Sequence, residues 1–507
     1  MDFECERGCR HAAGSGASHR NVRINRAERF EGGYLSMDTV GKRNDFLEKR
    51  QAVTAAGAKA RRRIELLLDD GSFMEIGAFV NQRPTEFGAV DAAAEGVVTG
   101  WGTIDGTPVC VFSQDVDALG GAVSEMHAKK ITTLYEYALK TGIPVVGFFD
   151  SKGARIAEGV DALNGYAQII ASAAKASSLV PQVAVISGIC GGAAALVAES
   201  FDFVVAVKGG ELYMHSPAVV AAVTETKGVS ATAEDAVKNG NASFFAEDDA
   251  AAAATVRTLI GMLPANSAGD RNYAATSDDI NRQADLNAMG DGAPRAVLAK
   301  IADNGSYLEA GAQYAAEVTT AFARFDGETV GVIGAEGAVT MEGIGKAAAF
   351  LSFCDTFGIS VLTIVHASGF EMTTCFEQFG GMSKAASLAA AYATADTAMI
   401  TLITGKATGS AYVTFGARGL GCDMAFAWPQ AEISAIAAPA AVDLLRLDDI
   451  REAADPIQKR AELEAEFADK TAAPYEAAKR GYVDEIIDPV ETRQAVVYAL
   501  GLLSTKD

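Results

Sequence analysis

A glycine-rich turn at residues 187–193 has the composition of a site that binds an oxygen atom. It follows the β-branched apolar run 183–186, which predicts a buried strand, and Gly191-Gly192 precedes an alanine-rich stretch that predicts a helix. The first N–H groups of a helix have no partner within it, and glycine lets a ligand approach them closely. Such donors can hold a developing oxyanion. An isolated turn of this kind also serves tight strand–helix packing, so a second observation is needed.

The second observation is that the chain repeats the arrangement. The apolar run that begins at Met399 ends at Gly405, and the small residues 409–411 follow it. Gly192 and Gly409 are 217 positions apart (409 − 192). Residues 142–153 match 358–369 at an offset of 216 (358 − 142), and residues 69–75 match 303–309 at an offset of 234 (303 − 69). Three collinear matches predict a duplicated domain. We name residues 187–193 the first glycine turn and residues 404–411 the second glycine turn.

Composition limits the classes of function. Hydrophobic residues make up 49% of the 507 residues and charged residues 21%, which is typical of a globular chain with a large core. The net charge of −22 disfavours nucleic acid and anionic membranes as partners. The seven cysteines form no CxxC motif, no HExxH motif occurs, and no apolar run reaches the ~18 residues of a membrane span. We therefore expect a cytoplasmic protein without disulfides, metal or nucleic-acid partner.

Four segments are predicted along the chain. Residues 1–36 carry six arginines and few large apolar residues, which indicates a disordered leader or a mis-assigned start with Met37 as the true first residue. Residues 37–263 form the first domain, 264–294 the connection and 295–507 the second domain. The order strand, strand, helix, strand, glycine turn, helix occurs in both domains and predicts an α/β fold.

Local signals place several elements. Residues 97–112 and 318–333 predict β-hairpins with Asp-Gly turns at 105–106 and 326–327. The basic patch 59–63 predicts a solvated helix face. The charged tail 443–479 has helical spacing.

The chain resembles a known family, the carboxyltransferase (beta) subunits of biotin-dependent acyl-CoA carboxylases of the propionyl-CoA/acetyl-CoA carboxylase type, together with the related acyl-CoA decarboxylase alpha subunits. The resemblance runs from about residue 40 to the end. It is carried in order by VVTGWGTIDG (97–106), Gly120-Gly121, EMH (125–127), DSKGARIAEG (150–159), AWPQAEI (427–433) and PYEAAKRGYVD (474–484). It implies two duplicated crotonase-like (ClpP/crotonase superfamily) β-β-α superhelix domains and a hexamer whose active sites lie between subunits.

The resemblance also implies the site. Gly192 and Ala193 would hold the acyl thioester oxygen, and Ser410 and Ala411 the ureido oxygen of biotin. Further residues that would bind coenzyme A or biotin are Gly191, Gly153, Ala154, Arg155, Gly120, Gly121, Gly369, Phe370, Gly409 and Val413. Arg155 could meet a phosphate of coenzyme A or, equally, cap a helix or lie at an interface.

The implied function is transfer of a carboxyl group between carboxybiotin on a carrier protein and the α-carbon of a short acyl-CoA, through an enolate held by backbone oxyanion holes. Because the chain has no Met-Lys-Met segment, biotin must arrive on a separate protein, and a biotin carboxyl carrier protein and a biotin carboxylase subunit are the expected partners. Three alternatives stay open. The first is the alpha subunit of a sodium-pumping methylmalonyl-CoA-type decarboxylase with a membrane subunit, the second is a crotonase-type enzyme without biotin, and the third is a catalytically inactive scaffold.

The chain departs from the family pattern at several positions. Ala193 and Lys152 stand where the family has glycine, Ser387 where it has lysine, and His366 where it has an acidic residue. We interpret His366 as a local packing change. We interpret Cys190, beside the first glycine turn, as a small buried residue rather than a nucleophile.

Overall fold

The structure of the chain is a computed structural model that describes residues 37–88, 92–224 and 230–506. The predicted leader, residues 1–36, lies outside the described residues. The chain divides into two units at Lys49. In its described part the first unit holds the beginning of helix α1 (Met37–Ala56), whose exposed side carries two i,i+4 ion pairs, Lys42–Asp38 at 2.7 Å and Lys49–Asp45 at 2.8 Å. All features described below belong to the second unit, Arg50–Asp507.

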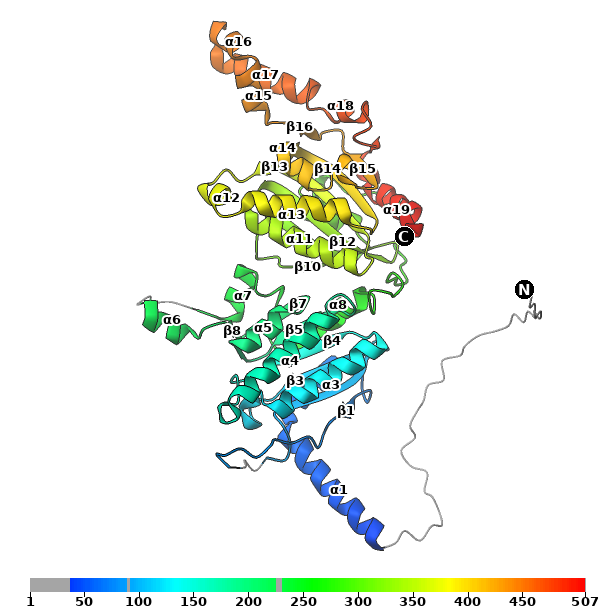
Figure 1. The fold of residues 1–507 in the computed structure, drawn as a ribbon. Coiled ribbons are helices and arrows are strands. Elements are labelled where there is room, and N and C mark those ends of the chain that lie inside the picture. Colours follow the sequence, from blue (N-terminus) through cyan, green and yellow to red (C-terminus); the bar gives the residue numbers. More distant parts are fainter. Residues whose placement is uncertain (1–36, 89–91, 225–229, 507) are drawn as a thin grey trace, which may run out of the picture. The chain divides into compact units, whose positions relative to one another are not determined.

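Two mixed sheets with the same strand order make up most of the second unit (Figure 1). In each sheet the first three strands are antiparallel and the rest are parallel. The first sheet is ordered β1 (Met74–Ile76), β2 (Val97–Ile104), β3 (Thr107–Gln114), β4 (Val145–Phe149), β5 (Gln182–Ile186), β7 (Phe203–Val207) and β9 (Phe244–Ala246). The second is ordered β10 (Leu308–Ala310), β11 (Val318–Phe325), β12 (Glu328–Val339), β13 (Val361–Phe370), β14 (Met399–Thr408), β15 (Met424–Ala427) and β17 (Glu485–Ile486).

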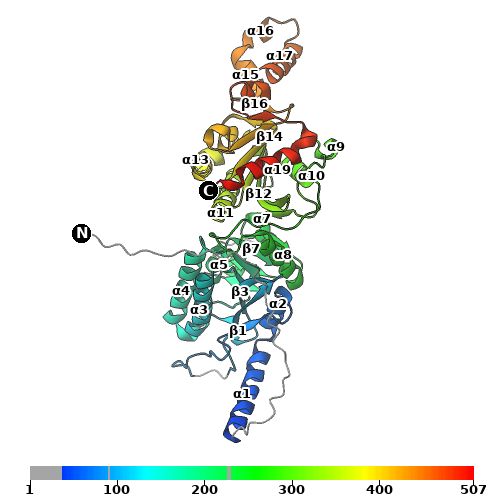
Figure 2. The same ribbon diagram turned by 90° about the vertical axis from the view of Figure 1, so that its right-hand side faces the viewer.

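The helices cover the two sheets in the same manner (Figure 2). One face of the first sheet carries α3 (Glu125–Thr141) and α4 (Val160–Ala176), and the other carries α2 (Ala58–Leu67) and α8 (Asp249–Met262). For the second sheet these places are taken by α11 (Met341–Thr356) and α13 (Gly381–Thr394), and by α10 (Pro294–Ile301) and α19 (Thr492–Leu502). The duplication predicted from three sequence matches thus extends to strand order and to helix placement.

The two hairpins form where they were predicted. Strands β2 and β3 pair from Val97 to Gln114, and β11 pairs with β12 from Val318 to Ala335. The turn residues have positive φ at both positions, 48° and 84° in the first hairpin and 51° and 82° in the second. This backbone is the one for which Asp-Gly is favoured in two-residue hairpin loops.

A buried or half-buried carboxylate holds each hairpin turn. The carboxylate of Asp69 accepts hydrogen bonds from the two N–H groups of the 105–106 turn at 3.0 and 2.9 Å. The carboxylate of Asp303 accepts the corresponding bonds from the 326–327 turn at 3.1 and 2.8 Å. The sequence match between 69–75 and 303–309 therefore reflects one structural role that was kept in both halves.

An arginine from the last helix of each half completes this arrangement. In α8, Arg257 Nη2 donates to Asp69 Oδ1 at 3.0 Å and Nη1 donates to a carbonyl at the end of α2 at 2.8 Å. In α19, Arg493 Nη2 donates to Asp303 Oδ1 at 2.7 Å and Nη1 to a carbonyl at the end of α10 at 2.8 Å. The two arginines are 236 positions apart (493 − 257). Each half is thus closed by a contact between its first and its last helix.

Aromatic rings join the two halves. The ring of Phe203 on β7 lies 4.9 Å from that of Phe353 on α11 and 5.8 Å from that of Phe322 on β11, measured between centroids. Phe322 in turn lies 5.0 Å from Phe350. All belong to or pack against one hydrophobic core that includes residues of both sheets. Apolar burial of this kind stabilises by roughly 25 cal/mol per Å².

Two further regions complete the fold. The helical stretch that precedes the first sheet is broken at Gly57, between α1 and α2, where an added Cβ would lie 2.9 Å from Val98 Cγ2 on β2. The predicted charged helical tail forms α15 (Ala438–Leu445), α16 (Leu447–Glu452) and α17 (Pro456–Lys470), which share a small core of Val442, Ile450 and Leu463.

Shorter helices are α6 (Pro217–Thr224), α7 (Ala233–Asn239), α9 (Leu286–Met289), α12 (Thr374–Gln378) and α18 (Pro474–Ala478). Within the described ranges, no helix is both long and apolar enough to cross a membrane.

The different burial of the two arginines yields a stability prediction. The Arg493 side chain is fully buried, whereas Arg257 is 27% exposed. Arg493→Met leaves a buried carboxylate unpaired and should cost about 3–5 kcal/mol of unfolding free energy. Arg257→Met breaks a more exposed pair and should cost about 1 kcal/mol or less. Thermal and urea unfolding of both variants measure the difference, and equal losses would contradict it.

Candidate functional site

The first glycine turn lies between strand β5 and helix α5 (Ala193–Glu199). The chain leaves β5, forms the short strand β6 (Ile189–Gly191) and reaches Gly192, whose φ of 61° and ψ of −126° are unfavourable for residues with a Cβ. An added Cβ at Gly192 would meet only one atom, Met214 O at 3.9 Å. Glycine is therefore required here by the backbone conformation and not by lack of space.

The free donors of this turn differ by one residue from the predicted pair. Strand β6 pairs in parallel with β8 (Glu211–Tyr213), and Gly192 N donates to Tyr213 O at 2.9 Å. Within the described part of the chain, no acceptor is assigned to the N–H groups of Ala193 and Ala194. The N–H of Ala193 thus has no assigned acceptor, while that of Gly192 is already used and the next free donor is Ala194.

The other glycines predicted for this half lie around the same turn. Lys152 N donates to Gly120 O at 3.0 Å, and Val123 N donates to Gly153 O at 2.9 Å. Ser151 N donates to Ile189 O on β6 at 2.9 Å. The segments that hold Gly120, Gly121, Gly153 and Ala154 are therefore tied to one another and to the strand that ends at Gly191.

Arg155 is engaged inside the protein. It forms a short ion pair with Glu95 and a second with Glu158 Oε1 at 3.4 Å, and its Nη2 donates to Ala122 O at 3.1 Å. Both carboxylates are fully buried and the arginine side chain is 11% exposed. These contacts with buried carboxylates disfavour binding of a phosphate by Arg155.

Arg63 of the basic patch 59–63 is a buried residue. The Arg63 side chain is only 2% exposed, so the prediction of a solvated face is wrong at this position. Its Nη2 lies 2.9 Å from Asp150 Oδ2, which Lys59 Nζ also contacts at 2.8 Å, and it donates to Ser187 O at 3.3 Å. A pair of charges separated by 87 residues in sequence has no local signal. We name Arg63 and Asp150 the buried ion pair of the first half.

Side chains near the first glycine turn are poorly suited to act as bases or nucleophiles. Burial lowers the pKa of His127 to about 3, so its imidazole is neutral at physiological pH. Burial raises the pKa of the Cys190 thiol, which disfavours the reactive thiolate and agrees with its interpretation as a packing residue. Asp150 is held in ion pairs with Arg63 and Lys59. The turn itself presents the backbone N–H donors of Ala193 and Ala194.

The second glycine turn repeats this construction at the end of β14. Gly409, with φ of 60°, begins helix α14 (Gly409–Thr414), and residues 406–408 of β14 pair in parallel with β16 (Glu432–Ser434) as β6 pairs with β8. The N–H groups of Ser410 and Ala411 have no assigned acceptor among the described residues. The predicted pair of donors is thus free on this side.

The remaining predicted residues of the second half lie next to this turn. Gly369 and Phe370 are the last residues of β13, which neighbours β14, and helix α14 packs against β13. The Phe370 ring stacks on that of Phe376 at 5.4 Å. Val413 is half exposed on α14. The first glycine turn follows β5 of the first sheet, and the second lies at the end of β14 of the second sheet (Figure 1). Each set of predicted residues is therefore assembled around its own turn.

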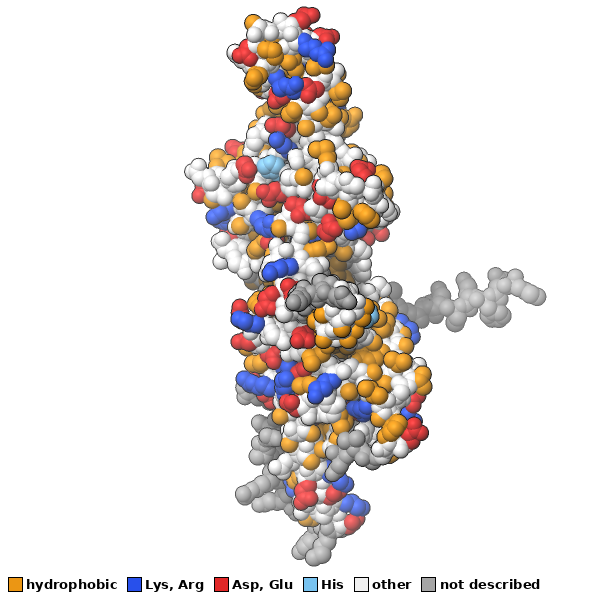
Figure 3. Space-filling model, turned by 90° about the vertical axis from the view of Figure 1, so that its left-hand side faces the viewer, with side chains coloured by type: hydrophobic (Ala, Val, Ile, Leu, Met, Phe, Trp, Pro, Cys, Tyr) orange, Lys and Arg blue, Asp and Glu red, His pale blue; other side chains and the backbone are white. Residues whose placement is uncertain are grey.

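Apolar side chains are exposed close to the first glycine turn. Leu196 on α5 is exposed, and so are Val160 and Leu163 on α4, which packs against α5. Figure 3 shows hydrophobic side chains gathered on this face. Contiguous exposed apolar surface of this kind is typical of protein–protein interfaces.

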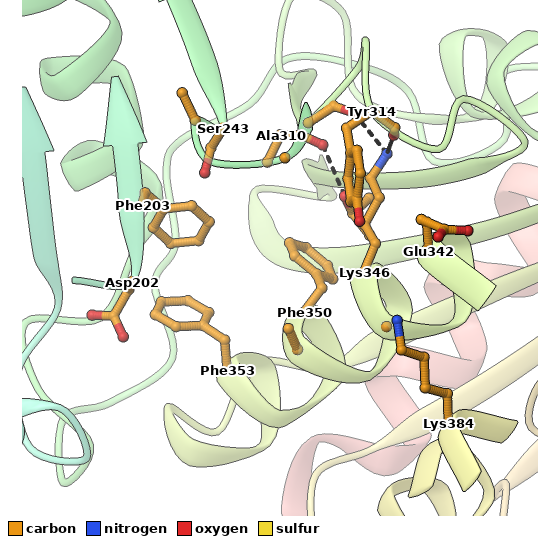
Figure 4. A pocket seen from close by; sticks show the side chains of 16 residues that line it. Asp202, Phe203, Ser243, Ala310, Tyr314, Glu342, Lys346, Phe350, Phe353 and Lys384 are labelled. Carbon is orange, nitrogen blue, oxygen red and sulfur yellow. Dashed lines mark hydrogen bonds between the residues drawn. The ribbon is translucent and has the colours of Figure 1, made fainter. Parts of the chain in front are cut away.

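A pocket of about 320 Å³ lies elsewhere, where the two halves meet (Figure 4). Phe203, Phe350 and Phe353 form its apolar side, and Lys346 and Asp202 are among its polar residues. None of the predicted site residues lines it. Lys346 Nζ donates to three carbonyls at 2.6–2.8 Å, and burial lowers its pKa to about 8.

Asp202, which lines this pocket, should make the stability of the folded chain depend on pH. Burial raises the pKa of its carboxyl to about 7, although it accepts a hydrogen bond from Gln182 N at 2.7 Å. A carboxyl with a raised folded pKa lowers stability progressively as the pH rises from about 4 to about 7. Asp202→Asn removes this effect, so its melting temperature relative to wild type should be higher at about pH 8 than at about pH 5. An offset that is the same at both pH values would contradict the shift.

A substitution at the first glycine turn tests its importance. Gly192→Ala strains the backbone without a steric clash and should displace the Ala193 donor, so activity should fall by ~10²-fold or more. Gly481→Ala is the matched control, because Gly481 also has positive φ, 72°, and open space but lies outside both turns. The control should lose about 1–2 kcal/mol of stability and keep its activity. Equal activity in the two variants would show that the turn is not the site.

Among residues 37–88, 92–224 and 230–506, no group of three or more His, Cys, Asp or Glu side chains is placed to hold a metal ion. Each glycine turn presents two backbone N–H donors that have no assigned acceptor among the described residues.

Comparison with known proteins gives one consistent family. Residues 54–507 match the family described as carboxyl transferase domain. Methylmalonyl-CoA decarboxylase subunit alpha of Propionigenium modestum is 38% identical over 91% of this chain and 92% of its own length. Propionyl-CoA carboxylase beta chain of Saccharopolyspora erythraea is 36% identical over 92% of this chain and 94% of its own length. The crystal structure of transcarboxylase 12S, described as a hexamer assembly with hydrolysed methylmalonyl-coenzyme A bound, has a TM-score of 0.87 at 35% identity and covers 94% of this chain and 97% of that chain.

These comparisons confirm the resemblance that was drawn from six sequence segments and the predicted fold of two duplicated crotonase-like domains. The domain boundaries and the roles of individual site residues stay predictions.

Proposed function

The chain belongs to the carboxyl transferase domain family, and from this we propose that it transfers a carboxyl group between biotin on a separate carrier protein and the α-carbon of a short acyl-CoA. The observation that carries the proposal is the duplicated glycine turn. Each turn has two N–H groups without an acceptor in the described residues, Ala193 and Ala194 in the first and Ser410 and Ala411 in the second. Two such sets fit two carbonyl oxygens.

The first set suits the thioester oxygen of acyl-CoA. Loss of the α-proton moves negative charge onto this oxygen, and preorganised N–H donors stabilise the charge in the transition state. Ala193 supplies one donor, and the bond from Gly192 N to Tyr213 O fixes the backbone that orients it. Helix α5 has only seven residues, so the local N–H groups are a better source of stabilisation than a helix dipole.

The second set suits the ureido oxygen of biotin. Ser410 and Ala411 present free N–H groups at a turn lined by small residues, which leaves room for a flat ring. Biotin, when bound, supplies a carboxyl group carried on a ureido nitrogen. The residues of this chain would hold and polarise the ureido oxygen, and no side-chain base of the chain is required.

The buried acids near the first turn argue against a hydratase or hydrolase without biotin. Such an enzyme needs a free Glu or Asp beside the thioester. Asp150 is paired with Arg63 and Lys59, and Glu95 and Glu158 are paired with Arg155. The second glycine turn would also have no purpose in such an enzyme.

Direction and partners follow from the relatives as proposals. Relatives named for decarboxylation and for carboxylation are similarly close, at 38% and 36% identity. We propose a biotin carboxyl carrier protein and a biotin carboxylase subunit as partners, with a membrane decarboxylase subunit as the alternative. The exposed apolar face near the first glycine turn and the hexamer of transcarboxylase 12S support a hexamer in which this face is covered. A cytoplasmic location stays a prediction.

The acyl group is proposed to be short. Val413 gives the second glycine turn a compact apolar neighbour. We expect acetyl or propionyl groups to be used in preference to long chains, although an apolar pocket distinguishes one methylene by only ~1–3 kcal/mol. Comparable turnover of an octanoyl thioester would contradict this expectation.

The function is tested by carboxyl exchange. The purified chain, without ATP or metal, should remove label from carboxyl-labelled malonyl- or methylmalonyl-CoA when a biotinylated carrier protein is present. Free biotin should serve poorly, because tethering raises the local concentration of the ring. Ser410→Pro removes one N–H donor and should abolish the exchange while acyl-CoA binding survives, whereas Ser410→Ala keeps the donor and should lose much less.

The controls separate the alternatives. Label loss that is the same with and without a biotin carrier would exclude the carboxyltransferase. Absence of label loss with every carrier would favour an inactive scaffold.

A further inference from the structure

The second residue of each glycine turn, Gly188 in the first and Gly405 in the second, packs against one side chain. The two halves use different side chains for this contact. In the first half Asp150 follows β4, and an added Cβ at Gly188 would lie 2.1 Å from Asp150 Oδ1. In the second half His366 on β13 takes this place, and an added Cβ at Gly405 would lie 2.8 Å from three atoms of its imidazole ring. The offsets agree, at 216 (366 − 150) and 217 (405 − 188). His366 therefore contacts the second glycine turn as Asp150 contacts the first.

The partner of Asp150 has also been replaced. The buried positions of α2 are Ala60, Arg63, Ile64 and Leu67, and those of α10 are Pro294, Val297, Leu298 and Ile301. The two sets coincide at a constant offset of 234 (294 − 60). Arg63, the partner of Asp150, thus corresponds to Val297, which is fully buried.

The corresponding positions of the two halves carry different groups. The first half has a buried ion pair, Asp150 with Arg63, and Lys59 and Asp249 make further contacts with its two members at 2.8 and 3.0 Å. The second half has an imidazole and a valine at the positions of Asp150 and Arg63. A carboxylate placed at residue 366 would therefore lack the partner that Arg63 gives to Asp150.

The connection made by Arg63 to the turn is replaced as well. In the first half Arg63 Nη2 donates to Ser187 O. In the second half the corresponding residue is Thr404, at an offset of 217 (404 − 187), and its hydroxyl donates to Gly292 O at 2.6 Å, just before α10. Each half therefore ties its turn to its first helix, by a charged contact in one case and a neutral contact in the other.

We propose that His366 is a positioning residue for the second glycine turn and that, with Val297 at the position of Arg63, it takes the place that the buried ion pair has in the first half. The inference rests on the proposed function, because the second glycine turn is there assigned to the ureido oxygen. His366 Nδ1 is buried without a hydrogen-bond partner among the described residues, and Glu336 on β12 is the neighbour of His366 across the strand pair. Its packing against Gly405 is what orients the strand that leads to Ser410 and Ala411.

The test exchanges the two kinds of support. His366→Asp places a carboxylate beside Gly405 without an arginine, and carboxyl exchange with the biotinylated carrier should fall by ~10-fold or more, because small displacements of binding groups have large effects on rate. Acyl-CoA binding, measured by titration, should be unchanged, since the first glycine turn lies in the other half. The double variant His366→Asp/Val297→Arg recreates the pair found in the first half and should recover most of the lost exchange. Val297→Arg alone should be impaired.

Matched variants keep the test decisive. His366→Asn introduces no carboxylate and should remain much closer to wild type than His366→Asp. Melting temperature and circular dichroism report folding. If His366→Asp fails to fold and the double variant folds and exchanges, the inference is supported. Exchange by His366→Asp at the wild-type rate, or a double variant no better than the single one, would overturn it. Failure of the wild-type chain to exchange would instead refute the proposed function.

Discussion

The carboxylates of Asp69 and Asp303 are the contacts on which both halves depend. Each accepts two N–H bonds from a hairpin turn and binds an arginine from the last helix of its half. Burial alone would raise the pKa of Asp69, but the bonds from the Gly106 N–H, the Thr103 hydroxyl and Arg257 outweigh burial and lower it to about 2. The ionised form is therefore the one that the fold stabilises, and the sheet, its first helix and its last helix are fixed to one another.

Strand pairing fixes the geometry of the two glycine turns. A parallel strand ends at a glycine turn in each half, and a second short strand pairs beside it, β8 in the first half and β16 in the second. This pairing fixes the strand end, and the helix that follows is too short to contribute much beyond its first N–H groups. The donors are therefore rigid parts of the backbone, which suits stabilisation of charge that develops on a carbonyl oxygen.

The duplication also shows what is not essential. The hairpin turns, the Asp–Arg contacts and the positive φ of Gly192 and Gly409 are present in both halves. The buried ion pair at the first turn differs from the residues of the second half, where His366 and Val297 stand at the corresponding positions. The groups that pack against each turn have therefore changed while the turn itself was kept.

The sequence by itself determined the features that depend on neighbouring residues. The Asp-Gly turns, the strand ends at the glycine turns and the duplication could be predicted because each has a local pattern, and six short segments were sufficient to identify the family. Only the tertiary structure decided what distant segments do to one another. Arg63 is buried because Asp150 lies against it, Arg155 is used by Glu95 and Glu158, and Gly192 gives its N–H to Tyr213 O. The first of these pairings joins residues 87 positions apart (150 − 63), and the sequence around either partner carries no sign of the other.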